Sequence, residues 1–473
     1  MPWRDAVAPA AMDRIAVVTP DAHARAVLCR VADAGVIDLE REPSPEPGPT
    51  RRAWERRRRL LPDPSLAPAP ELCLGEIDTA TLERVGDAAA LAGEAELEEV
   101  LASSVDDGAV AAFVGWIPSD AVGPLAERLA PEGGALVRLP RPRGAQPPTL
   151  LRPSPARGFQ PLVDTYVTVP YRDLNPSIAA GLAYVVMFGM MFGDVGHGLL
   201  LLVGGAALLW WRTPRLAQIR WAAPFVVGAA LASIAFGLAY GEAFGPTGAV
   251  PTLWMAPLKH PTTLLAVAVV IGAGLLTLSY LLGSVNRWRE GGGASALTAL
   301  SGLAGMAMYL GLVLVALGWW RHLAAVVVAG AVLAAAGVTL GFLGLFARAG
   351  GRSAGAVQAG VELFDGVVRL GTNTVSFARL AAFGLTHAAL TAAIWTAAVA
   401  LARRGGGMVV VAGIIFLAGN ALAFALEALI AGIQALRLEY YELFSRVFAT
   451  EGRVFRPWQV RTRRPKEAPC SPG

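Results

Sequence analysis

An apolar segment of helical length, residues 373–390, carries Arg379 near its middle and His387 eight residues later. A guanidinium keeps its proton in every accessible environment, so a membrane helix that contains one must offer it a protein partner or water. We therefore expect Arg379 to lie opposite an acidic group or in a water-filled cavity. The rest of the chain must supply the elements that hold it there.

A second apolar segment, residues 408–446, brings more polar groups to the same part of the chain. Glu427 and Gln434 are seven residues apart and share one helix face, and Arg437 lies on an adjoining stripe. Carboxylates and histidine can pass protons through water, whereas arginine holds its proton and can force a nearby carboxylate to ionise. This combination indicates an ion path in which a stationary arginine meets a carboxylate that arrives from another subunit.

Both segments contain further charges. Residues 362–402 include Asp365 and, one turn later, Arg369, while residues 408–446 include Glu442. An acidic and a basic residue four positions apart are neighbours on a helix surface. We therefore expect Arg369 to be able to pair with Asp365. Asp365 and Glu442 are themselves candidates for the ion path.

The composition is that of a polytopic membrane protein. Of 473 residues, 55% are hydrophobic and 16% are charged, and the mean hydropathy is +0.51. Residues 178–211 are apolar over 34 positions. As one helix they would measure about 51 Å, against about 30 Å for the hydrocarbon core of a bilayer. The sequence GDVGHG at residues 193–198 interrupts this stretch and favours a hairpin of two short helices.

With this hairpin the sequence predicts about eight transmembrane helices in an all-α membrane domain. The last two are about 40 residues long, so they need strong tilt or extension beyond the bilayer. Both termini then lie in the cytosol, and most loop arginines, including Arg212 and Arg215, fall on the cytoplasmic side. We expect an integral protein of a prokaryotic plasma membrane. The other spans are expected at residues 216–240, 262–284, 296–319, 323–347, 362–402 and 408–446.

Residues 1–170 have the pattern of a small cytosolic α/β domain that ends in a Pro-rich linker. Two β-α-β units are expected there and indicate a ferredoxin-like fold. Residues 171–452 would form the transmembrane ion-translocating domain, and residues 453–473 a basic cytosolic tail. The expected strands are residues 14–20, 35–40, 109–117 and 134–139, with a helix inside each unit and an arginine-rich, solvated helix at residues 51–59.

The sequence excludes several functional classes. It has no Gly-x-x-x-x-Gly-Lys loop and no dinucleotide fingerprint after a strand, so we expect no ATP-hydrolysing site and no catalytic residue in this chain. Three scattered cysteines make neither a disulfide framework nor a metal site, and no cofactor is expected. The basic tract at residues 461–466 is too short to favour nucleic-acid binding. The N-terminus lacks the apolar region of a secretory signal.

Four motifs in a fixed order resemble those of subunit a, called subunit I in prokaryotes, of V-type and archaeal-type rotary ATPases, the 116 kDa subunit family. The resemblance covers residues 171–446. The motifs are YRDLNP at residues 171–176, MFGMMFGDVGHG at residues 187–198, NTVSFARL at residues 373–380 with His387, and Glu427 followed ten residues later by Arg437.

This resemblance implies a stator subunit in which Arg379 and Arg437 face a rotating proteolipid c-ring and displace a proton, or a sodium ion, from its carboxylate. Other subunits would hydrolyse or synthesise ATP, and the N-terminal domain would contact the peripheral and central stalks. The implied half-channel residues are His387, Glu427, Asp365 and Glu442, with Gln434 on the same face as Glu427. Structural roles are expected for Asp194, Gly196, His197 and Asn373.

Two features leave alternatives open. The soluble part is about half as long as is usual in the family, which would suit a scaffold that has lost stalk contacts. A ring-independent ion channel or secondary transporter would also use buried charges, although such transporters favour inverted repeats, and none is visible here. His387 alone could also be a helix-packing hydrogen bonder. Glu242 and His260, at loop edges, are expected to be solvated.

Overall fold

The computed structural model describes residues 8–41, 48–59, 67–73, 79–106, 108–142, 145–152, 158–210 and 219–463. The chain divides into two compact units. The membrane unit contains Pro153–Glu451, and the N-terminal unit contains Pro9–Arg152 together with Gly452–Gly473. The predicted cytoplasmic arginines Arg212 and Arg215, and the tail from residue 464 onward, lie outside the described residues.

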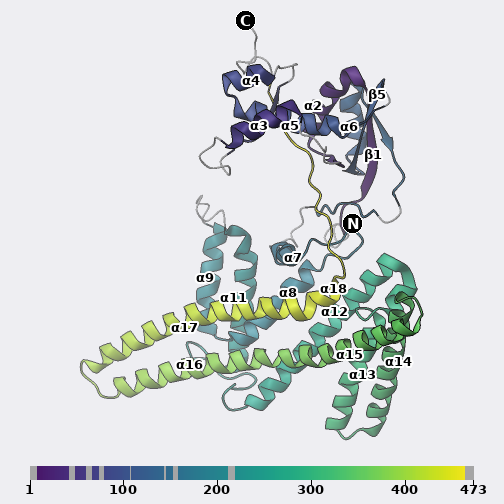
Figure 1. Cartoon of the computed structure of the whole chain (residues 1–473). Helices are drawn as coiled ribbons and strands as arrows, with labels where there is room; N and C mark the ends of the chain where they lie inside the picture. The colour runs from purple at the N-terminus through teal and green to yellow at the C-terminus, as the bar shows by residue number, and fades with distance from the viewer. Residues whose placement is uncertain are drawn as a thin grey trace. The chain divides into compact units, whose positions relative to one another are not determined.

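The N-terminal unit is built on an antiparallel sheet (Figure 1). Its strands pair in the order β2-β5-β1-β6, with β4 also on β5. Helix α2 (Ala24–Ala34) connects β1 to β2, and α6 (Val122–Leu129) connects β5 to β6, so both predicted β-α-β units are present, with β2 and β6 shorter than predicted. The ferredoxin-like classification stays a prediction. The strands are β1 (Met12–Pro20), β2 (Asp38–Leu39), β4 (Val105–Asp106), β5 (Val110–Pro118) and β6 (Ala135–Arg138).

Alternating apolar residues explain why this sheet forms. Ile15 and Val17 lie two positions apart in β1, so both point to one face of the sheet. They share a fully buried core with Val27 and Leu28 of α2. Burial of such side chains stabilises the unit by about 1.5–3 kcal/mol each.

Three further helices and a second, parallel strand pair complete this unit. The arginine-rich helix α3 exposes its last four arginines to solvent, as predicted, while Arg51 near its start pairs with Glu99 of α5 at 2.5 Å. These elements are α3 (Pro49–Arg59), α4 (Thr79–Val85), α5 (Ala88–Ala102), β3 (Glu71–Cys73) and β7 (Arg461–Arg463).

The described part of the C-terminal segment folds into the N-terminal unit. Strand β7 pairs with β3, and Trp458 is buried with its backbone N–H donating to the carbonyl of Ile37 at 2.8 Å. Residues 453–473 are predicted to be a basic tail, and in the structure residues 453–463 belong to the N-terminal unit.

The membrane unit is helical. Among the described residues, six helical stretches are long and apolar enough to span a bilayer. Helices α8 and α9 are shorter, at 15 and 16 residues. Each would measure about 22–24 Å, so the prediction of eight spans stays a prediction. The helices are α7 (Gln160–Tyr166), α8 (Ser177–Met191), α9 (Val195–Trp210), α11 (Ala223–Tyr240), α12 (Pro261–Thr298), α13 (Leu303–Trp320), α14 (Ala324–Arg348), α15 (Ser353–Ser376), α16 (Ala378–Ala402) and α17 (Met408–Leu438).

The expected interruption of the first apolar stretch is present. Helix α8 ends at Met191 and α9 begins at Val195. Helix α9 packs along α11, whereas α8 contacts α11 and α16. Both halves of the interrupted stretch thus pack on α11, and α8 also contacts α16.

The last two apolar stretches are long, as predicted. The first, Ser353–Ala402, has 50 residues and comprises α15 and α16 with Phe377 between them. Helix α17 continues through a π-helical turn, η6 (Glu439–Phe444), into α18 (Ser445–Val447). Figure 1 shows α15, α16 and α17 steeply inclined to α13 and α14. If α13 and α14 cross the bilayer upright, the long helices must be strongly tilted.

A buried acidic residue lies where the chain enters α8. Asp173 is fully buried, 3.9 Å from the guanidinium of Arg287 near the end of α12. Burial raises the pKa of Asp173 to about 7, and the neighbouring carboxyl of Glu290 adds to the rise. Arg287 itself pairs with Glu290 at 2.6 Å, so it only partly offsets the burial of Asp173.

Asp173→Asn should remove a pH dependence of stability. Because the folded pKa lies above the usual value of 3.8, the folded chain holds a proton that the unfolded chain releases between about pH 4 and pH 7. The free energy of unfolding therefore falls as pH rises through that window, by up to about 1.4 kcal/mol per pH unit. Thermal unfolding of the chain in lipid nanodiscs at several pH values measures this slope. Asp120→Asn, at an exposed ion pair with Arg152, is the control; the same slope in wild type and Asp173→Asn would contradict the assignment.

Candidate functional site

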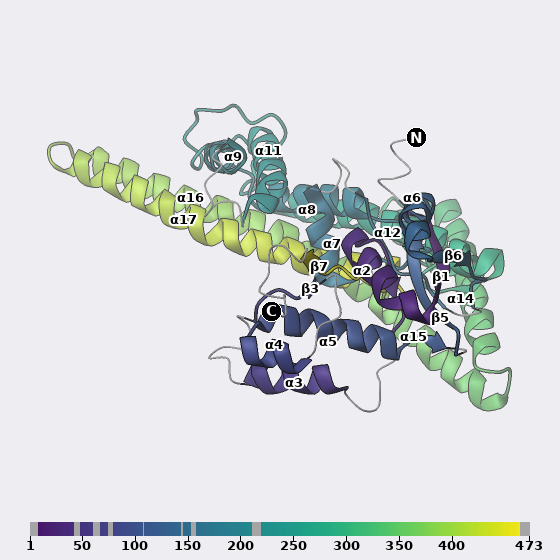
Figure 2. The ribbon, with the colours of Figure 1, turned by 90° about the horizontal axis from the view of Figure 1, so that it is seen from above.

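His387 of α16 and Glu427 of α17 form a direct contact inside the membrane unit. Nδ1 of His387 hydrogen-bonds to Oε2 of Glu427, although the two residues are 40 positions apart. His387 is 2% exposed and the Glu427 side chain is 13% exposed. They meet because α16 and α17 run side by side, as Figure 2 shows. The structure thus joins two residues that the sequence placed on separate helices.

Aromatic and imidazole rings from the break between α8 and α9 surround this pair. The ring of Phe192 lies 4.9 Å from that of His387, and the ring of His197 lies 5.6 Å from it, between centroids. Phe424 of α17 packs against His197 at 5.8 Å. His197, predicted to be a structural turn residue, therefore adjoins the candidate ion path.

Asp194 holds the break in place. Its carboxylate accepts hydrogen bonds from the backbone N–H groups of His197 at 2.9 Å, Phe244 at 3.0 Å and Gly245 at 3.0 Å. The first bond caps the start of α9, and the other two fix the loop that follows α11. A Cβ at Gly196 would enter the ring of Phe244, which explains a glycine there. These contacts support structural roles for Asp194 and Gly196.

Glu242, in the loop after α11, was predicted to be solvated, and this prediction was wrong. Glu242 is only 5% exposed. Its backbone carbonyl accepts the N–H of Val195 at 2.9 Å, which draws the loop against the break. His260, in contrast, is exposed as predicted.

The two arginines differ from His387 in their surroundings. Arg379 lies at the start of α16, and the charges that act on it are those of Arg437 and Glu442. Its Nη1 is buried, and within the described ranges that atom has no hydrogen-bond partner. Neither Arg379 nor Arg437 takes part in an ion pair with another described residue. None of the described residues is therefore the acidic ion-pair partner expected for Arg379.

Arg437 stands on an exposed, apolar face of α17. Leu426, Leu429, Ile433 and Tyr441 are all half or more exposed, and they follow one another at helical spacing. A face of this kind contacts lipid or another helix. Arg437 is four residues from both Ile433 and Tyr441, so its guanidinium lies on that contact surface.

The remaining predicted residues are not gathered at one place. Asp365 pairs with Arg369 at 2.8 Å on α15, beyond the break at Phe377, which confirms the predicted pairing. Glu442 is buried in η6 and feels the charges of Arg379 and Arg437. Gln434 keeps a buried side-chain oxygen without a hydrogen-bond partner among the residues described.

Asn373 connects α15 to α18. With its amide oriented to satisfy both groups, the side chain donates to the carbonyl of Arg369 at 3.1 Å and accepts from Nη2 of Arg446 at 2.9 Å. Arg446 also bonds the hydroxyl of Tyr280 on α12. Asn373 thus has a structural setting, in line with its expected role.

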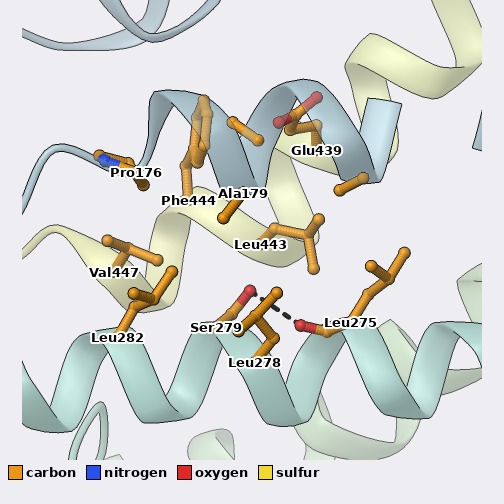
Figure 3. A pocket seen from close by; sticks show the side chains of 12 residues that line it. Pro176, Ala179, Leu275, Leu278, Ser279, Leu282, Glu439, Leu443, Phe444 and Val447 are labelled. Carbon is orange, nitrogen blue, oxygen red and sulfur yellow. Dashed lines mark hydrogen bonds between the residues drawn. The ribbon is translucent and has the colours of Figure 1, made fainter. Parts of the chain in front are cut away.

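Glu439 was outside the predicted site. It is fully buried in the π-helical turn, and in the described structure neither carboxylate oxygen has a hydrogen-bond partner. Figure 3 shows it beside a small cavity lined by Leu275, Leu443 and Phe444. π-turns are often found at functional sites. The sequence does show an acidic residue two positions after Arg437. Two positions on a helix point to different faces, so this spacing did not link Glu439 to the site.

Comparison with known proteins adds independent information. The family model for the V-type ATPase 116kDa subunit family matches residues 111–227. The A-type ATP synthase subunit I of Pyrococcus horikoshii is 27% identical over 369 residues, which cover 74% of this chain and 54% of that protein. The same subunit of Thermococcus kodakarensis is 28% identical over 376 residues, with the same coverage of both chains. A V-type proton ATPase subunit a of Neurospora crassa is 31% identical over 106 residues, 21% of this chain and 12% of that protein. The chain spans about half the length of the archaeal relatives it matches.

Asp194→Asn should destabilise the membrane unit. An amide cannot replace a carboxylate that accepts three backbone N–H groups, so at least one buried donor loses its acceptor, at a cost of about 2–3 kcal/mol. Unfolding titrations in lipid micelles with a metal chelator present measure the loss. Asp365→Asn, which breaks an exposed pair, should cost less than about 1 kcal/mol. Equal losses in the two variants would show that the three bonds do not hold the break.

Proposed function

We propose that this chain, which belongs to the V-type ATPase 116 kDa subunit family, is the ion-translocating stator subunit of a V/A-type rotary ATPase. The observation that carries the proposal is the pair Arg379 and Arg437. Arg437 lies on an exposed apolar helix face, its charge acts on Arg379, and no described residue forms an ion pair with either. Charges of this kind suit a partner that arrives from outside the chain.

The partner we propose is the acidic residue of a rotating proteolipid c-ring. A protonated carboxyl group that approaches Arg379 meets a permanent positive charge, which lowers its pKa and releases the proton. Because arginine itself keeps its proton, it also blocks direct leakage between the entry and exit paths. Arg437, which acts electrostatically on Arg379, would share this task.

His387 and Glu427 are proposed to conduct the ion between the ring and one side of the membrane. An imidazole and a carboxyl group can each accept and release a proton, and their direct contact supplies a transfer step. Asp365, Glu442 and Gln434 are proposed for the remaining half-channel positions. The transported ion would be a proton or sodium.

The N-terminal unit is proposed to bind stalk subunits on the cytosolic side, with both termini in the cytosol and the membrane unit in a prokaryotic plasma membrane. A ferredoxin-like fold and eight crossings, with α8 and α9 as a pair of short spans, would complete this topology. ATP would be hydrolysed or synthesised on other subunits.

Purification of the chain from its native membrane separates this function from a ring-independent channel or transporter. The proposal expects the chain to accompany a proteolipid with a carboxylate in mid-helix and ATPase subunits. A channel or secondary transporter would be isolated without them. Recovery of the chain alone under mild detergent conditions would overturn the stator assignment.

Arg379→Ala should abolish ATP-driven ion pumping while the complex still assembles. Without the guanidinium the ring carboxyl keeps its ion, so the ring has nothing to exchange. Ion uptake into inverted vesicles and subunit composition on native gels measure the two properties. Arg403→Ala, in the exposed turn after α16, is the matched control and should pump normally. Normal pumping by Arg379→Ala would refute the mechanism.

A further inference from the structure

We propose that Asp194, His197 and His387 form a binding site for a first-row divalent metal ion, best matched by Zn²⁺, with Glu427 as an outer partner. The site joins the break after α8 to α16. One ligand atom from each of the three residues lies within 4.8 Å of the others. All three residues are buried.

His387 is oriented as a metal ligand. A carboxylate of Glu427 accepts a hydrogen bond from Nδ1–H, so in the neutral imidazole the other nitrogen, Nε2, carries a free lone pair. Nε2 is buried, and no described group hydrogen-bonds to it. Histidines that bind metals commonly donate their second ring N–H to a carboxylate, which fixes the tautomer and raises the basicity of the ligand.

His197 is poorly satisfied, and a metal would supply the partner it lacks. It is fully buried, and within the described residues neither ring nitrogen makes a hydrogen bond of normal geometry; the backbone of Asn420 acts on the imidazole only as a weak partner. Its Nδ1 lies 3.8 Å from Oδ1 of Asp194. Leaving polar atoms unpaired in an apolar setting is costly. The rings of Phe192, Phe244 and Phe424 pack around the imidazole.

Asp194 has room for one more partner. An ionised carboxylate offers about four lone-pair positions, and three are taken by backbone N–H groups. Those bonds hold the carboxylate in place beside the histidines. The third ligand is therefore positioned before any metal arrives.

The surrounding charge favours a cation. The strongest charges that act on His387 come from Glu427, Asp194 and Glu242, all of them acidic. Two neutral imidazoles offset none of this negative charge, whereas a dication offsets up to two units of it. The side chain of Glu427 is partly exposed, so the cluster reaches the surface of the membrane unit at this residue.

The ligand types select the metal. Two imidazole nitrogens and one carboxylate suit Zn²⁺, whereas Ca²⁺ and Mg²⁺ require oxygen ligands. Bonds of about 2.0–2.1 Å place tetrahedral ligands about 3.3 Å apart. The side chains must therefore close inward by roughly 1 Å, and the fourth position would hold water.

Metal binding has a consequence that rests on the proposed function. If His387 conducts protons, an ion on its Nε2 removes that nitrogen from the path. Zn²⁺ would then inhibit pumping by occupying the path, not the arginines.

The test is metal binding by the full chain, purified with a tag that contains no histidine and reconstituted in nanodiscs. Co²⁺ is the probe, because its visible absorption distinguishes tetrahedral from octahedral coordination, and Zn²⁺ should displace it at one ion per chain. His387→Gln and His197→Gln should each weaken binding at least about 100-fold, and Glu427→Gln by about 10- to 100-fold. The matched control His260→Ala removes an exposed histidine and should bind normally.

Two results would overturn the site: no tetrahedral Co²⁺ spectrum in the wild type, or the same spectrum in the His197→Gln/His387→Gln double variant. Unfolding temperatures in chelator show whether each variant is folded, and His387→Asn provides a second variant if the glutamine fails. Binding requires neither ring nor ATP, so its outcome is independent of the stator assignment. Inhibition of ATP-driven pumping by Zn²⁺, reversed by chelator, then tests the consequence separately.

Discussion

The contact between His387 and Glu427 is the interaction on which the polar interior of the membrane unit depends. An ionisable group taken out of water needs a partner that satisfies it. His387 obtains one only because α16 and α17 lie side by side over their length, which brings together side chains 40 positions apart. The break after α8 adds His197 on another side. The two long helices and the interrupted stretch thus all contribute side chains to one polar cluster around His387.

The arginines are arranged in the opposite way, and the chemistry of the side chains explains the difference. Histidine and carboxylate exchange protons, so a fixed partner within the chain tunes and uses them. Arginine does not release its proton, and it is useful where a carboxylate comes and goes. Arg437 accordingly stands on an exposed face between Ile433 and Tyr441. In the proposed mechanism the buried pair, His387 and Glu427, conducts the ion, and the exposed Arg437 takes part in its exchange with the ring.

The features that could be predicted from the sequence are those that depend on residues close together in the chain. The break near Asp194 follows from three glycines in six residues, and the pairing of Asp365 with Arg369 follows from helical spacing. Contacts between distant segments were beyond such patterns. The burial of Glu242 depends on a loop folding back onto the break, and the docking of Trp458 depends on a strand pair between opposite ends of the chain. Neither leaves a periodic signal.

Asp194 and His197 show why a structural assignment from a motif can be incomplete. Both belong to one turn, yet their polar atoms differ in how well they are hydrogen-bonded. The carboxylate of Asp194 is bound by three N–H groups, so its position is determined by the backbone. His197 is held by the same turn, but no described residue gives its two nitrogens a hydrogen bond of normal geometry, and the backbone of Asn420 is only a weak partner. A rigid turn that buries a poorly satisfied imidazole beside His387 stabilises the fold less than an apolar residue would. That cost is understandable if the imidazole has a ligand or a proton to hold.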